Sequence, residues 1–134
     1  MKARLEKLKR IERLQKQLHD LSRWKLTHLA EQRERLATAH IEMIQALGEG
    51  LLSFGGAAAA ATRRIRSLEL EISAAEVEHA AQVKQTFAQG ARSKMAEHVV
   101  ERAEEAHRRE VDKRSLNELI EQSVQRSQQG SHKP

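Results

Sequence analysis

The stretch LGEGLLSFGGAAAAAT, residues 47–62, decides the fold because it interrupts a chain otherwise rich in Leu, Arg, Lys, Glu and Gln. Four glycines lie within it, and apart from Glu49 the residues between them are apolar or small. Glycine readily takes the left-handed backbone conformations that end a helix and reverse the chain. We therefore predict a turn over residues 48–56 between two long segments.

The segment before the turn has the pattern of one long helix. Residues 1–47 contain neither proline nor glycine, and apolar residues recur at helical spacing with one slip of register near Trp24. The expected stripe consists of Leu8, Ile11, Leu14, Leu18, Leu21, Leu26, Leu29, Leu36, Met43 and Leu47. The pattern predicts a helix over residues 3–47 that buries this stripe against a partner.

The segment after the turn predicts a second, longer helix over residues 57–124. Its stripe begins with Ala61, Ile65, Leu68, Ile72 and Ala75 at steps of three and four. It continues with Val83, Phe87, Ala91, Met95 and Val99 at steps of four, so the stripe drifts around the helix. The Gln- and Ser-rich tail, residues 125–134, is expected to fray.

These elements predict an all-α protein in which two long helices form an antiparallel coiled-coil hairpin, one elongated domain over residues 1–134. The composition agrees, because 32% of residues are charged and 2% are aromatic, as in long helices. If Leu47 faces Ala57, the numbers of facing residues sum to about 104. Helix 1 then ends opposite Ala103, and the rest of helix 2 has no partner within the chain.

Catalysis and cofactors are not expected. The chain has no cysteine, so disulfides and zinc–thiolate sites are excluded. A hairpin of two helices encloses no pocket for a small-molecule substrate. Two Glu-x-x-His pairs, Glu76–His79 and Glu104–His107, have metal-ligand spacing but lie on one helix about 42 Å apart. We interpret them as solvated polar residues and expect no enzyme activity, no metal and no cofactor.

Charge and hydropathy suggest two further classes of protein, one that binds nucleic acid and one that contacts a membrane. The net charge is +5, and residues 1–25 carry nine Lys or Arg against three acidic residues. This basic N-terminal segment could contact the phosphates of a nucleic acid. Long helices also carry such charges on their solvent-exposed faces, however, and a single tryptophan offers little stacking for bases, so we do not favour nucleic-acid binding. The apolar stretch at the turn could dip into a membrane interface but not cross a bilayer. It could equally plug the end of the hairpin, and we favour a docking patch for another protein.

The C-terminal sequence REVDKRSLNELIEQSVQR, residues 109–126, resembles the end of helix 2 in the FliJ family of flagellar export stalks and its virulence counterpart YscO. Leu116, Asn117 and Glu118 stand where that family has Leu-Asp-Glu, and Asn117 departs from the pattern. The segment KLKRIERLQKQL, residues 7–18, is similar to the N-terminal pattern of the family. The two-helix layout of the whole chain resembles this family as well.

The resemblance implies a central-stalk component of a type III export apparatus, either flagellar or virulence-associated, that assists protein export. Its partners would be the hexameric export ATPase, an export-gate membrane protein and export chaperones. It implies a cytoplasmic protein, peripheral to the inner-membrane machinery, and we expect a monomeric hairpin. A generic coiled-coil adaptor or chaperone, able to dimerise through the unpartnered end of helix 2, is the alternative.

The resemblance also assigns two sets of contact residues. The set expected at the ATPase-proximal end is Lys7, Arg10, Leu14, Lys16, Leu116, Glu118 and Arg126. The set expected at the tip, toward the export gate, is Met43, Leu51, Phe54, Leu68 and Ile72.

Overall fold

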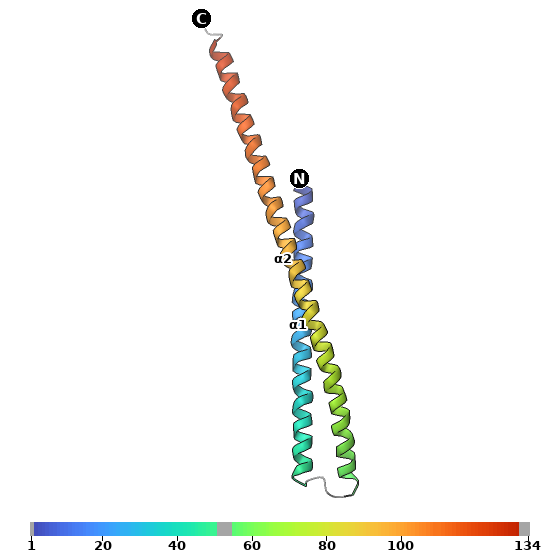
Figure 1. Cartoon of the computed structure of the whole chain (residues 1–134). Helices are drawn as coiled ribbons and strands as arrows, with labels where there is room; N and C mark the ends of the chain where they lie inside the picture. The colour runs from blue at the N-terminus through green and yellow to red at the C-terminus, as the bar shows by residue number, and fades with distance from the viewer. Residues whose placement is uncertain (1, 51–54, 132–134) are drawn as a thin grey trace. The chain divides into compact units, whose positions relative to one another are not determined.

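The computed structural model shows two long helices packed against each other as an antiparallel hairpin (Figure 1). Helix α1 spans Lys2–Gly48 and helix α2 spans Ala57–Ser131. The structure describes residues 2–50 and 55–131. The predicted fold class is therefore confirmed. Helix α2 runs past residue 124, where the sequence predicted its end, and residues 132–134 lie outside the described residues.

Contacts divide the chain into two units, each built from a piece of both helices. The hairpin unit is Lys16–Arg92, which includes the turn. The terminal unit combines Met1–Gln15 with Ser93–Pro134.

Glycine conformation ends α1 and begins the turn. The Glu49 amide donates to the Gln45 carbonyl at 2.9 Å, and the Gly50 amide donates to the Leu47 carbonyl at 3.2 Å. Gly50 and Gly55 have φ angles of 75° and 60°, in the left-handed region that glycine enters without the penalty a side chain brings. Gly48, by contrast, is the last helical residue of α1. Two of the four glycines thus have the conformation predicted for the turn.

We predict that Gly50→Ala and Gly55→Ala each lower the free energy of unfolding by about 1–2 kcal/mol, the cost of placing an L-residue in a left-handed conformation. Gly48→Ala is the matched control, because an alanine in a helix is up to about 1 kcal/mol better than glycine. None of the three positions has an atom that a new Cβ would meet within 4 Å. Urea unfolding followed by far-UV circular dichroism measures the difference. Equal effects at all three positions would contradict the requirement for a left-handed backbone conformation at Gly50 and Gly55.

The seam between the helices in the hairpin unit is apolar next to the turn. Ala61, Leu68 and Ala75 are buried at seven-residue spacing on α2, and Leu68 is only 1% exposed. Leu36 and Met43 are half-buried on α1. Burial of a side chain such as Leu68 contributes about 1.5–3 kcal/mol. This part of the seam agrees with the stripes predicted from the sequence.

Further from the turn the same seam becomes polar. The seven-residue repeat of α2 continues to Gln82 and Gln89, which are buried together with Thr86. Gln82 Nε2 and Thr86 Oγ1 both donate to the Ser22 carbonyl of α1, at 3.2 and 3.3 Å, and Gln82 Nε2 also donates to Thr86 Oγ1 at 3.3 Å. His19 is half-buried on the facing side of α1. Hydrogen bonds therefore replace apolar contact in this part of the hairpin.

The apolar stripes predicted for the seam before Trp24 and from Val83 onward lie outside it, and that part of the prediction was wrong, whereas Leu26 and Leu29 after Trp24 are half-buried as predicted. Leu14 and Leu21 of α1 are about half exposed, and Phe87 of α2 is 81% exposed. Helices that pair over many turns keep one heptad register, so residues at that spacing face the partner whatever their polarity. The apolar stripes are displaced by one residue from this register.

Gly90 is a point of close approach between the two helices. A Cβ built on Gly90 would lie 3.0 Å from His19 Nε2, closer than ordinary van der Waals contact. The absence of a side chain therefore leaves room for the imidazole. The sequence suggests only a soft point in the helix here, because glycine is about 1 kcal/mol less favourable than alanine within a helix.

We predict that Gly90→Ala changes stability little in the natural chain, because the gain in helix propensity is offset by displacement of the His19 ring. In a His19→Ala background the same substitution should stabilise the protein by about 1 kcal/mol. A double-mutant cycle by urea unfolding isolates this coupling, expected to exceed about 0.5 kcal/mol. Additive effects of the two substitutions would show that the ring does not restrict position 90.

The terminal unit continues the pairing with few large apolar side chains. Val100 and Ser93 of α2 are buried, and Leu5 and Leu8 of α1 are half-buried. Lys9 Nζ and Glu104 Oε1 form an ion pair at 3.6 Å, with both side chains more than 40% exposed, so it contributes little to stability. This ion pair joins residues whose numbers sum to 113, whereas the sequence predicted a sum of about 104 for facing residues.

Candidate functional site

The C-terminal part of α2 is a helical surface that α1 does not cover. Every residue from Val111 to Gly130 is exposed. Ion pairs four residues apart precede it, Arg109 to Glu105 at 2.6 Å and Arg114 to Glu110 at 3.2 Å. Such pairs add a few tenths of a kcal/mol each to an exposed helix. This segment is therefore helical without help from α1.

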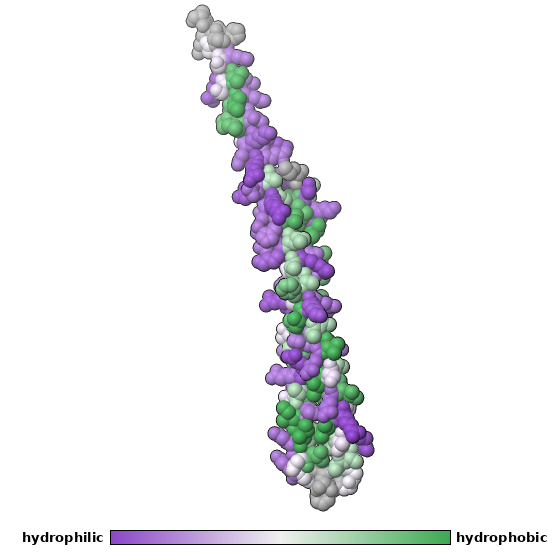
Figure 2. Space-filling model, in the orientation of Figure 1, coloured by the Kyte–Doolittle hydropathy of each residue, from purple (hydrophilic) through white to green (hydrophobic). Residues whose placement is uncertain are grey.

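One side of this segment is apolar. Leu116, Leu119, Ile120 and Val124 are each at least half exposed. Their spacing of three, one and four residues places them on one face of a helix. Figure 2 shows green apolar side chains between purple hydrophilic ones on the C-terminal part of α2. We call residues 116–124 the C-terminal face.

Leu116, Leu119 and Ile120 of the C-terminal face do not continue the seam of the terminal unit, and only Val124 lies at a seam position, in the seven-residue series of Ala96 and Ala103. Val100 and half-buried His107 of the seam are seven residues apart, and the next positions at that spacing are Arg114 and Glu121. Both are charged and exposed. A longer α1 would therefore meet charged side chains at these positions. Leu116, Leu119 and Ile120 lie on another side of α2, where a different partner could bind.

The residues expected at the ATPase-proximal end belong to both units. Lys7, Arg10 and Leu14 lie exposed on α1 of the terminal unit, and Lys16 belongs to the hairpin unit. Leu116, Glu118 and Arg126 lie exposed on α2. The N-terminal part of α1 lies beside residues 99–106 of α2, with which it lines a groove. Leu116 is ten residues further along, about 15 Å at 1.5 Å per residue.

A shallow groove marks where the N-terminal part of α1 lies against α2 in the terminal unit. It has a volume of about 290 Å³ and lies among Leu5, Leu8, Val99 and Ala103, with the side chains of Arg4 and Arg102 at its edges. Its lining combines aliphatic side chains with two cations. Such a lining suits an apolar side chain from an acidic protein surface rather than a reactive small molecule.

The residues expected at the tip have different environments. Leu68 is buried and Ile72 and Met43 are half-buried, so their surfaces are largely taken up by the pairing of the two helices. Leu51 and Phe54 lie outside the described residues. The apolar tip thus remains a prediction from the sequence.

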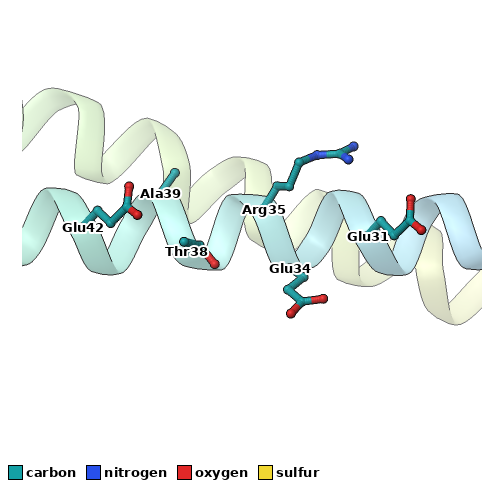
Figure 3. A pocket seen from close by; sticks show the side chains of 6 residues that line it. All are labelled: Glu31, Glu34, Arg35, Thr38, Ala39 and Glu42. Carbon is teal, nitrogen blue, oxygen red and sulfur yellow. The ribbon is translucent and has the colours of Figure 1, made fainter.

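A surface depression on α1 offers no reactive arrangement. It has a volume of about 440 Å³, and all six lining residues belong to α1. Figure 3 shows Arg35 and Glu34 pointing to opposite sides of that helix, and the labelled side chains do not converge on a common point. Among the described residues, no group of three His, Asp or Glu side chains could hold a metal ion.

Two polar contacts link the helices on the turn side of the hairpin unit. His40 Nε2 lies 3.3 Å from Glu69 Oε1, and Arg33 NH1 lies 3.4 Å from His79 Nδ1. His79 belongs to one of the two Glu-x-x-His pairs, and it contacts a cation rather than its neighbouring carboxylate. The arrangement favours a role in pairing the helices.

No helix in the described ranges, 2–50 and 55–131, is long and apolar enough to cross a membrane. Comparisons with protein-family models, with curated proteins and with solved structures yield no match for this chain.

Proposed function

We propose that this chain is a non-catalytic interaction protein, a stalk-like component of a type III export apparatus that assists protein export by linking the export ATPase to the export gate. The observation that carries the proposal is the C-terminal face, an apolar surface on a helical segment that α1 does not cover. The segment also contains the residues that resemble the FliJ and YscO families. A hairpin of two helices is consistent with those families, although many other proteins share it.

The geometry favours a macromolecular partner over a small ligand. Leu116, Leu119 and Ile120 form a convex ridge, and a ridge of this kind fits into a groove or between two helices of another protein. Arg114 and Glu121 border the ridge and would supply the polar rim of such an interface. In this proposal the ATPase ring grips the C-terminal face, and the gate and the export chaperones contact other surfaces.

The test is capture of partners by the tagged full-length chain from lysate of its own organism, followed by ATPase stimulation with the purified chain. We expect recovery of a hexameric ATPase and a rise in its activity. The variant Leu116→Ala/Leu119→Ala/Ile120→Ala should weaken this binding by at least about tenfold, because buried apolar anchors dominate interface energetics. Alanine preserves helix propensity, so the helical circular dichroism signal should persist.

The matched control is Ile41→Ala/Ile44→Ala, which removes exposed apolar side chains from α1 in the hairpin unit. This control should bind the ATPase as the natural chain does. Recovery of unrelated proteins without an ATPase or a gate protein would replace the stalk proposal with that of a generic coiled-coil adaptor. Equal losses in both variants would remove the C-terminal face from the proposal.

A further inference from the structure

Helix α2 has a second apolar face within the hairpin unit, on the side away from α1. Leu70 and Val77 are 74% and 70% exposed, although both are large and apolar. Lys84 and Ala91 follow at the same seven-residue spacing and are also exposed. The buried residues of the seam, such as Leu68 and Ala75, lie two residues earlier in the repeat, which places this series on the opposite side of the helix.

A second series completes the face. Ser73, Ala80 and Phe87 are exposed, also seven residues apart, and Phe87 is 81% exposed. Each lies three residues after a member of the first series, which is the spacing of the two core positions in a coiled coil. We call these two series together the outer face of α2. Because α1 covers one face of α2 and the outer face carries a second heptad pattern, one more helix could pack against α2.

We propose that the outer face is a self-association surface on which a second copy of this chain binds with its α2 antiparallel. In an antiparallel pair one series packs against the other series of the second copy. Leu70 then faces Phe87 of the second copy, and Val77 faces Ala80. Each large side chain therefore meets an apolar neighbour, and the small ones lie at the centre, where the two helices can approach closely.

Charge decides the orientation. In a parallel pair Lys84 would face Lys84 of the second copy, which like-charge repulsion disfavours. In the antiparallel pair Lys84 faces Ser73 of the second copy, and the carboxylate of Glu76 lies one turn after that serine. Glu76 is exposed, so its carboxylate can reach the incoming ammonium group, whereas Glu69 contacts His40 of α1. The outer face is thus complementary to itself in one direction only.

The size of the contact sets the expected affinity. The outer face runs from Leu70 to Ala91, about 32 Å of helix. A contact of that length and one helix face wide lies at the low end of specific interfaces, so we expect a dissociation constant in the micromolar range. The sequence predicts a monomeric hairpin, and the outer face argues instead for a reversible dimer. None of its residues belongs to the C-terminal face, so the inference goes beyond the proposed function and its test is separate.

The first test is sedimentation equilibrium of the full chain, whose mass is 15.2 kDa. We expect a reversible dimer at tens of micromolar. Phe87→Glu should weaken dimerisation at least about tenfold, since it places a charge in the apolar contact. Gln85→Glu, which adds the same charge on an exposed position outside the outer face, is the matched control and should leave the dimer unchanged. Both variants should keep the natural helix content, because neither side chain is buried.

The charge arrangement has its own test. Lys84→Glu should weaken the dimer, because the new carboxylate then lies beside Glu76 of the second copy. Adding Glu76→Lys should restore much of the affinity. Failure of the double variant to recover affinity, with helix content intact, would remove the antiparallel charge pairing from the proposal.

Cysteine cross-linking fixes the orientation, since the natural chain has no cysteine. Leu70→Cys alone should not form a disulfide between copies, because the two cysteines lie seventeen residues apart along the pair, about 26 Å. A mixture of Leu70→Cys and Phe87→Cys chains should form a mixed disulfide. A monomer at all concentrations, a dimer that Phe87→Glu leaves intact, or efficient cross-linking of Leu70→Cys by itself would each overturn the proposal.

Discussion

Two helices can bury only one face each against one another, and a seven-residue repeat sets which face that is in this chain. The repeat passes through Ala61, Leu68 and Ala75 of α2 and then through Gln82 and Gln89 without a change of register. Small residues and hydrogen-bonded polar residues therefore occupy the seam. As a result, many of the larger apolar side chains of the chain remain on the surface, where they are available to other proteins.

The sequence predicted the architecture well because its signals are local. The glycines around residue 50 and the absence of helix-breaking residues before Leu47 are read directly from the chain, and the structure has helices on both sides of that turn. The seam next to the turn was also predicted, since apolar periodicity and the heptad repeat coincide at Leu68. Beyond Ala75 the apolar periodicity and the heptad repeat no longer coincide. Hydropathy then pointed to Val83 and Phe87, while the helices pair through Gln82 and Thr86.

The candidate surfaces were harder to predict because exposure is a property of the pair of helices and not of the sequence of one. Because residues 109–126 resemble the FliJ and YscO families, Leu116 was expected to contact a partner, and it is exposed. Phe87 was assigned to the interior of the hairpin by its spacing, and it became the most exposed apolar residue of the outer face. Only the partner helix distinguishes these cases, since both residues belong to apolar stripes on the same helix.

The polar part of the seam affects how the two helices can come apart. Where Gln82 and Thr86 bind the Ser22 carbonyl, separation of the helices exposes amide and hydroxyl groups that water can hydrogen-bond. Opening an apolar seam would instead expose surface that promotes aggregation. The helices can therefore separate locally and pair again in this part of the hairpin without promoting aggregation. The close-packed residues near the turn keep the two helices in register.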